Sequence, residues 1–296
     1  MEEINEVDLF GNKIEQDVLL RDKFIEPPFS VLDTKSGTWQ DRKRAWKDIG
    51  LLSDVGRDAT TFNMKDWADK KGEQGELSGN KLPSDTSIFD PALCEVLYKW
   101  FCPDGGIILD PFAGGSVRGI VANKLGYHYL GIELRQEQVD SNREQAKNIL
   151  PLDNQPIWIC GDSNKILEPI EEKYDFVFSC PPYFNLEVYS DLPEDLSNMS
   201  YQEFVKAYKN IITKSCSKLK HGALACFVVG EVRGKDGGFI GLVPDTITAF
   251  KESGMIFYNE AILLNSLASA ALRAGGNMKS RKLVKCHQNI LVFKKG

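Results

Sequence analysis

The sequence predicts an α/β fold in which a mostly parallel, twisted sheet carries helices on both faces. From residue 87 onward, short apolar runs alternate with amphipathic helical patterns, as in chains built from βαβ units. Four of these runs end on polar or special residues, at Asp110, Glu133, Asp162 and Ser179. The carboxyl ends of parallel strands meet at one edge of a sheet, where open α/β folds bind their ligands. We therefore expect the functional site at this edge.

The amino-terminal part of the chain reads differently from the rest. Residues 1–25 are strongly charged and are expected to form a mobile acidic arm, followed by an extension over 26–86 that ends in a polar, glycine-rich linker. Within the extension, Ser36 or Thr38 is expected to cap a helix that places Trp46 and Ile49 inward and stops at Gly50.

Residues 87–296 are expected to form one domain. After a helical pattern that starts near Pro91, the predicted strands cover 107–109, 129–132, 157–160, 175–178, 222–229, 260–264 and 289–293. The predicted helices between them cover 117–125, 136–149, 201–219 and 243–254. A long polar loop is expected over 265–287.

Composition narrows the class of protein. The chain has 296 residues, of which 42% are hydrophobic, enough for a sizeable core. Its net charge of -6 argues against a uniformly basic surface, although basic residues cluster near 42–47 and 273–285. The seven cysteines show neither close pairs nor metal-type spacing, so no disulfide framework and no metal site is expected. The acidic start and the lack of long apolar runs predict a cytoplasmic protein without membrane segments.

A glycine-rich turn follows the first strand of the domain. It runs from Asp110 to Ser116 as Asp-Pro-Phe-Ala-Gly-Gly-Ser, and Glu133 lies about twenty residues further on, the spacing that places a carboxylate beside a ribose. An acid at the start of the turn would repel a phosphate. It suits a ligand with a positive amino or sulfonium group, which the small residues Ala113, Gly114 and Gly115 allow to approach the backbone.

A second motif ends the strand over 175–178. The sequence Ser-Cys-Pro-Pro-Tyr over 179–183 contains two prolines that cannot continue a sheet ladder, so we expect a rigid loop. An aromatic side chain held by such a loop at the ligand edge is suited to chemistry on a flat ring.

Together these motifs resemble a known family. The turn at Asp110 is similar to the D-P-F-x-G-x-G turn of S-adenosylmethionine-dependent DNA methyltransferases, and Cys180–Tyr183 resembles their (Asp/Asn/Ser)-Pro-Pro-aromatic motif. The stretches beginning at Pro27, Trp39 and Ser179 are similar to those of bacteriophage and prophage DNA methylases. The resemblance implies a Rossmann-like class I methyltransferase fold over 87–296, double-stranded DNA as partner, and a bacterial host cytoplasm. The implied reaction is methyl transfer to adenine N6 or cytosine N4 of a flipped-out base.

The resemblance also implies which residues form the site. Glu133 would bind the ribose of S-adenosylmethionine, Asp162 the adenine amine and the glycine turn the methionine part, and Tyr183 or Phe184 would stack on the target base. The full set for the cofactor is Phe89, Asp110, Pro111, Phe112, Ala113, Gly114, Gly115, Ser116, Glu133, Leu134, Asp162 and Ser163. The set for catalysis is Ser179, Cys180, Pro181, Pro182 and Tyr183. The set for DNA contact is Arg42, Arg44, Arg233, Arg273, Lys279 and Arg281.

Cys180 departs from the family pattern, which has Asp, Asn or Ser before the two prolines. A thiol is a weak hydrogen-bond acceptor, so three alternatives stay open. Ser179 or backbone carbonyls accept the amino protons, Cys180 accepts them itself, or Cys180 is a nucleophile toward a pyrimidine ring carbon. Methylation of RNA or of protein and a catalytically weak DNA-binding role also remain open, as do the choice between adenine and cytosine and the oligomeric state.

Overall fold

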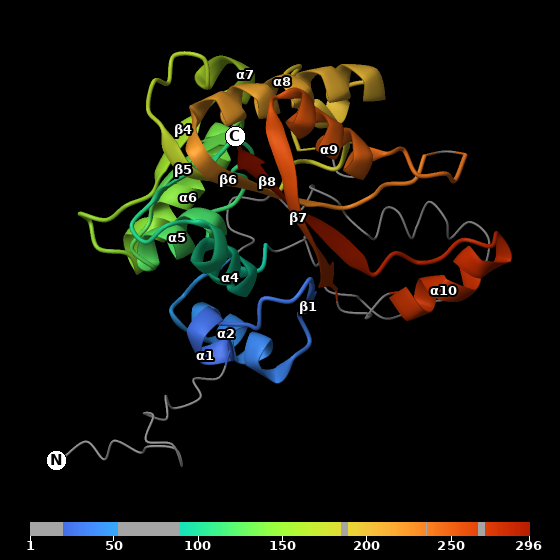
Figure 1. Cartoon of the computed structure of the whole chain (residues 1–296), viewed down its shortest axis with the longest axis horizontal. Helices are drawn as coiled ribbons and strands as arrows, with labels where there is room; N and C mark the ends of the chain where they lie inside the picture. Colours follow the sequence, from blue (N-terminus) through green and yellow to red (C-terminus); the bar gives the residue numbers. More distant parts are fainter. Residues whose placement is uncertain (1–19, 53–88, 185–188, 235, 266–269) are drawn as a thin grey trace, which may run out of the picture.

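A single sheet organises the chain. The computed structural model describes residues 20–52, 89–184, 189–234, 236–265 and 270–296. Within them, eight strands pair in the order β1-β7-β8-β6-β5-β2-β3-β4, and all neighbours are parallel except the two pairs that involve β8 (Figure 1). The strands are β1 (Val31–Asp33), β2 (Ile107–Asp110), β3 (His128–Glu133), β4 (Ile157–Cys160), β5 (Tyr174–Ser179), β6 (Leu219–Val229), β7 (Met255–Leu264) and β8 (His287–Lys295).

Helices cover both faces of this sheet. One face packs on α2 (Gly37–Asp48), α4 (Pro91–Phe101), α5 (Val117–Lys124) and α6 (Gln136–Ile149). The other packs on α8 (Tyr201–Lys218) and α9 (Leu242–Glu252), which lie above the sheet in Figure 1. The remaining elements are α1 (Leu20–Phe24), α7 (Ser163–Ile166), the 3-10 turn η2 (Leu196–Asn198) and α10 (Ala270–Lys279). The predicted mostly parallel sheet with two helical layers is confirmed.

Three local expectations were wrong. Helix α10 occupies part of the segment expected to be a polar loop, because Gly275 and Gly276 in its middle mask the helix-forming residues before them. Strand β1 was not expected, and it forms only because β7 offers it an edge. Ile49 is 42% exposed although it was expected to face inward with Trp46, because it caps α2 after the last helical turn.

The described part of the amino-terminal extension packs on the rest of the sheet. Ser36 caps α2 as expected. Two indole N–H groups of α2 donate to α4 and to the residue that caps it: Trp46 Nε1 to Glu95 Oε2 at 3.1 Å, and Trp39 Nε1 to the cap Asp90 Oδ2 at 3.1 Å. The expected linker over 69–86 and most of the arm lie outside the described residues, so the domain boundaries stay a prediction.

Among the residues that the structure describes, no helix combines the length and the apolar character needed to cross a membrane.

Candidate active site

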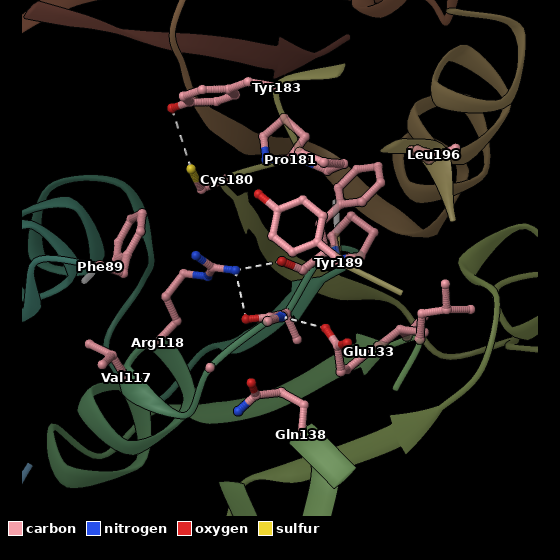
Figure 2. A pocket seen from close by; sticks show the side chains of 18 of the residues that line it. Phe89, Val117, Arg118, Glu133, Gln138, Cys180, Pro181, Tyr183, Tyr189 and Leu196 are labelled. Atoms are coloured by element: carbon pink, nitrogen blue, oxygen red, sulfur yellow. Dashed lines mark hydrogen bonds between the residues drawn. The ribbon is translucent and has the colours of Figure 1, made fainter. Parts of the chain in front are cut away.

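A pocket of about 710 Å³ opens at the carboxyl edge of the sheet. This volume lies within the range of roughly 300–1,000 Å³ found for small-molecule and cofactor sites. Gly114, Glu133 and Asp162 line one part of it, and Cys180 and Tyr183 line another (Figure 2). The two motifs recognised in the sequence therefore share one cavity, although they are about seventy residues apart in the chain.

The glycine turn is held from both sides by hydrogen bonds. Gly114 has a φ of 54°, a left-handed conformation that glycine adopts without strain. Its N–H donates to Glu133 Oε2 at 2.9 Å, and its carbonyl accepts from Asn142 Nδ2 at 2.8 Å. The turn is thus fixed against β3 and α6, with space for a ligand over Gly114, where an added Cβ would meet nothing within 4 Å.

Two carboxylates border the same part of the pocket. Glu133 Oε1 accepts from the N–H of Arg135 at 3.0 Å, and Asp162 Oδ1 caps α7 by accepting from the N–H of Asn164 at 2.8 Å. A carboxylate offers about four acceptor sites, so each of these side chains can accept from several donors at once. Asp162 Oδ2 has no hydrogen-bond partner among the described residues. The ribose hydroxyls and adenine amine of S-adenosylmethionine are donors of this kind, and the residues fit that cofactor.

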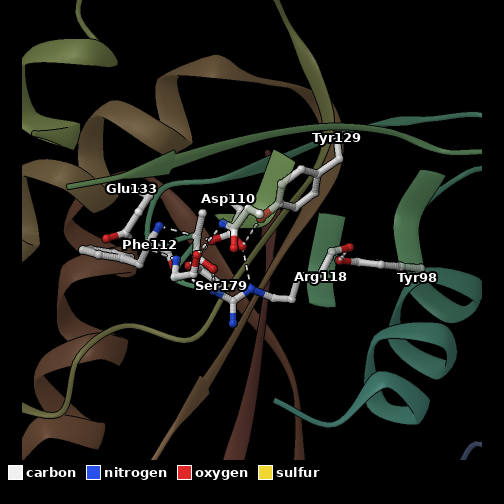
Figure 3. A network of polar contacts seen from close by, with 10 residues as sticks. Tyr98, Asp110, Phe112, Arg118, Tyr129, Glu133 and Ser179 are labelled. Carbon is white, nitrogen blue, oxygen red and sulfur yellow. Dashed lines mark hydrogen bonds and ion pairs between the residues drawn. The ribbon is translucent and has the colours of Figure 1, made fainter. Parts of the chain in front are cut away.

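Asp110 differs from its expected position. Its side chain is fully buried beneath the pocket, where it accepts from Arg118 Nε at 2.5 Å, Ser179 Oγ at 2.5 Å and Tyr129 Oη at 2.7 Å (Figure 3). Burial, followed by the charge of Asp110, raises the pKa of Tyr129 well above its ordinary value, so this hydroxyl stays a donor. With its oxygens occupied by these donors, Asp110 connects the glycine turn to the Pro-Pro loop and does not point into the pocket.

Arg118 is the residue that sequence reasoning missed. Its Nη2 donates to the carbonyls of Phe112 at 2.5 Å and Ala113 at 2.8 Å, and its guanidinium carbon lies 4.6 Å from the centre of the Phe89 ring (Figure 2). Burial opposes its charge, but Asp110, Tyr129 and Cys180 together outweigh burial and raise the pKa of Arg118. A signal existed: an arginine in the first turn of a helix opposes the macrodipole and therefore requires a carboxylate nearby.

The Pro-Pro loop presents one aromatic ring to the pocket. Tyr183 Oη lies 3.5 Å from Cys180 Sγ and donates to the carbonyl of Val228 at 3.4 Å. Burial raises the pKa of Tyr183 well above its ordinary value, so the hydroxyl stays protonated. Phe184 turns away and packs edge-on against Tyr201 and Phe204, with ring centroids 5.2 and 5.6 Å apart. Of the two aromatic candidates, Tyr183 is the one that the pocket contains.

The other expected site residues divide into those that line the pocket and those that support it. Ser179 and Ser116 are buried and point to protein partners, Asp110 Oδ1 and Gln145 Oε1. Ser163 lines the pocket and donates to the carbonyl of Pro111 at 2.6 Å. The remaining expected residues that line the pocket are Phe89, Pro111, Phe112, Ala113, Gly115, Leu134, Pro181 and Pro182. Side chains that were not expected there include Lys35, Gln40, Lys43, Asn265 and Gln288.

The expected DNA-contacting arginines of α2 are engaged in ion pairs. Arg42 Nη1 lies 2.7 Å from Glu95 Oε1, and Arg44 pairs with Asp41 on the same helix. Because a paired guanidinium must leave its carboxylate to bind phosphate, these two are weaker candidates than unpaired cations would be.

The other expected basic residues follow β6 or lie on and after α10. Arg233 donates to the carbonyl of Gly237 at 2.8 Å and stacks over Phe239 at 4.2 Å. Arg273, Lys279 and Arg281 are exposed on and after α10, which projects from the ligand edge of the sheet (Figure 1). The sequence has no Asp or Glu after Glu260, so the charged residues of α10 and of the segment that follows it are all Lys or Arg.

Comparison with known proteins adds an independent observation. Solved structures that resemble the fold include TrmN from Thermus thermophilus, with 13% identity, a TM-score of 0.46, and coverage of 77% of this chain and 52% of TrmN. This chain therefore spans about half the length of TrmN. Magnesium protoporphyrin IX methyltransferase from Synechocystis, solved with bound SAH, has 12% identity and a TM-score of 0.47, over 79% of this chain and 94% of the other. A TehB-like SAM-dependent methyltransferase from Corynebacterium glutamicum has 16% identity and a TM-score of 0.42, over 79% and 96%.

A family model also matches part of the chain. It describes a DNA methylase of the N6/N4 type and matches residues 23–144, which contain the described extension, the glycine turn and Glu133, but not the Pro-Pro loop. Residues 23–144 are thus similar to DNA methylases of the N6/N4 type, in agreement with the class of enzyme expected from the motifs.

Proposed function

We propose that this chain methylates adenine N6 or cytosine N4 of a base flipped out of double-stranded DNA, with Cys180–Tyr183 as the loop that holds the base. One observation carries the proposal: the glycine turn and the Pro-Pro loop open into the same pocket. Asp110 supports this arrangement, since its carboxylate accepts hydrogen bonds from Arg118 and from Ser179. Arg118 also donates to carbonyls of the glycine turn, and Ser179 begins the Pro-Pro loop. The reacting groups are thereby held at a fixed separation, the main requirement for an in-line transfer.

The chemistry required of the protein is alignment. When bound, S-adenosylmethionine supplies an electrophilic methyl group on its sulfonium sulfur. The lone pair of an exocyclic amine is delocalised into the base ring, so the loop must accept the amino protons and orient the nitrogen. Ser179 Oγ is committed to Asp110, which leaves the backbone carbonyls of the loop and Cys180 Sγ as the acceptors. Tyr183 offers its ring as a stacking partner, which offsets part of the cost of unstacking the base, a few kcal/mol.

The basic α10 segment is the proposed DNA contact. Arg273, Lys279 and Arg281 are exposed, and the carboxyl edge from which α10 projects also holds the pocket. A duplex bound there would present a flipped base to the Pro-Pro loop, while lysine and arginine contacts to phosphate supply affinity without sequence information. Arg233 would extend this surface, and Arg42 and Arg44 would join it only by exchanging their carboxylate partners for phosphate.

The test is a transfer assay with identification of the product. Purified protein is incubated with methyl-labelled S-adenosylmethionine and with duplex DNA, single-stranded DNA or RNA, and the nucleosides are analysed by mass spectrometry. We expect N6-methyladenine or N4-methylcytosine from duplex DNA. Label in RNA alone, or in no substrate, contradicts the proposal.

Cys180 is tested separately. A Cys180→Ser variant should retain transfer, because a hydroxyl accepts a hydrogen bond at least as well as a thiol. A covalent adduct between Cys180 and 5-fluorocytosine in DNA, together with loss of activity in the serine variant, would instead assign carbon methylation.

The resemblance of the stretches at Pro27, Trp39 and Ser179 to bacteriophage and prophage methylases further supports a role on DNA inside a bacterial host cytoplasm. The acidic residues 1–25 and the linker over 69–86 belong to this proposal as segments outside the methyltransferase domain. Methylation mapping of host DNA after expression of the chain would test it, and unmodified host DNA would oppose it.

A further inference from the structure

Arg118 has donors that the fold does not use. Its side chain is 6% exposed, and its Nε and Nη2 are bonded to Asp110, Phe112 and Ala113. Its Nη1 has no hydrogen-bond acceptor among the residues that the structure describes, and Arg118 lines the pocket. A buried guanidinium normally satisfies most of its five N–H groups, so unused donors at a cavity wall indicate a ligand atom that accepts from them.

The position of the guanidinium limits what that atom can be. Arg118 stacks on Phe89, and Figure 2 shows its guanidinium beside the Phe89 ring, with Cys180 above it. Cys180 is also among the groups that act on the charge of Arg118, after burial and Asp110, which agrees with this proximity. The unused donors therefore lie next to the residue that precedes Pro181, where the target amine is held in the proposed function.

The charge of the Arg118–Asp110 pair further limits which ligand atom can accept from Arg118. Asp110 neutralises Arg118 through a direct ion pair with 2.5 Å between Nε and Oδ2, and that carboxylate is fully buried. The pair presents N–H donors to the pocket with little net charge, which suits a neutral acceptor better than a carboxylate. It also avoids placing an uncompensated cation beside a sulfonium methyl donor.

We propose that Arg118 Nη1 donates a hydrogen bond to the ring nitrogen beside the target amine, N1 of adenine or N3 of cytosine, and so selects the bases that carry this pattern. Adenine and cytosine place an acceptor next to the amino group on the Watson–Crick edge. Guanine places an N–H next to its amine, and thymine has an N–H and no amine, so both would meet Arg118 donor to donor. This specificity role rests on the proposed function, because it needs a flipped base at the Pro-Pro loop.

Base analogues test the contact at a single atom. Once nucleoside analysis has identified the methylated base, a duplex carries 1-deazaadenine at that position, which keeps the amine and replaces N1 by C–H. 3-Deazacytosine serves for a cytosine target. We expect single-turnover transfer by the wild-type protein to fall about 10- to 100-fold, the effect of one lost charge-assisted hydrogen bond. 7-Deazaadenine, or 5-methylcytosine, is the matched control and should react within about threefold of the natural base.

Variants assign the penalty to Arg118. Arg118→Lys keeps a cation beside Asp110 but lacks the Nη1 group. The variant should therefore lose activity on the natural base and show little further loss of activity on the deaza analogue. Lys43→Met, at another wall of the pocket, should keep the full analogue penalty. Cofactor affinity, measured by calorimetry, shows whether the glycine turn is intact, and Arg118→Gln replaces the lysine variant if that affinity is lost.

Two results would overturn this inference and leave the proposed function standing. One is wild-type transfer to the deaza base within about threefold of the natural base. The other is a full deaza penalty in an Arg118 variant that still binds the cofactor. By contrast, failure of the wild-type protein to methylate any DNA would remove the proposed function itself.

Discussion

Gly230 offers a way to displace Tyr183 without touching it. This glycine follows β6, and a Cβ built on it would lie 2.9 Å from Tyr183 Cε2 and 3.3 Å from Cδ2. Carbon atoms in contact are normally separated by about 3.5–4.0 Å, so a Gly230→Ala substitution must shift the ring by roughly 0.6–1 Å. The hydroxyl cannot resist, since its contacts to Val228 O and Cys180 Sγ are long, at 3.4 and 3.5 Å. Misplacement of this size costs up to about 10²-fold in rate, and we expect kcat to fall about 10- to 100-fold.

The assay separates this effect from damage to the fold. Transfer to duplex DNA is measured under saturating cofactor, together with the Kd of S-adenosylmethionine and the melting temperature. Overpacking of about 1 kcal/mol should lower Tm by only a few degrees. The Kd should not change, because β5 separates β6, which precedes Gly230, from β2, which precedes the glycine turn. Gly37→Ala is the control, since nothing lies within 4 Å of its added Cβ. A Gly230→Ala protein with wild-type kcat would refute the assigned position of Tyr183 in the reaction.

Three further predictions concern the fold and the DNA surface. Asp110→Asn leaves Arg118 buried without its counter-charge, so the free energy of unfolding measured in urea should fall by about 3–5 kcal/mol. An unchanged unfolding curve would contradict the ion pair. Replacing Lys279 and Arg281 by Ala should reduce the slope of log K against log salt for duplex DNA by about 2, with cofactor affinity unchanged; an equal slope would exclude α10 from the phosphate contacts. The pKa of Asp175 is lowered: burial raises it, but Lys220 and the N–H of Ile107 together outweigh burial. Its contribution is therefore present above about pH 4 and lost as the pH falls through its folded pKa, so Asp175→Asn should cost about 1 kcal/mol at pH 7, and the difference should vanish in acid.

The sequence predicts those parts of the site that depend on local spacing. Glu133 and Asp162 could be placed because each ends an apolar run, and parallel strands bring such ends together. The roles of Arg118 and Asp110 could not be predicted, because their pairing depends on how α5 is oriented toward β2. The spacing of hydrophobic residues in the sequence does not indicate this orientation. Equally, α10 is masked by its two glycines.

The same limit applies to the far edge of the sheet. The pairing of Val31–Asp33 with β7 brings Lys35, Gln40 and Lys43 to the pocket. This tertiary contact could not be predicted from a strand of three residues. The resemblance to a family supplied the cofactor and the reaction, whereas the walls of the pocket came from the structure.

Strand β1 has a consequence for how this chain can be shortened. Its three residues pair with Ile262, Leu263 and Leu264 and occupy the hydrogen-bonding groups of a ten-residue strand at the end where that strand meets the ligand edge. A protein trimmed to residues 87–296 would leave those groups open to a second molecule, the usual origin of edge-to-edge aggregation. It would also lose one wall of the cavity in the same cut. The described residues before residue 53 thus both cover the end of β7 and form one side of the pocket, so their removal should reduce solubility and ligand binding together.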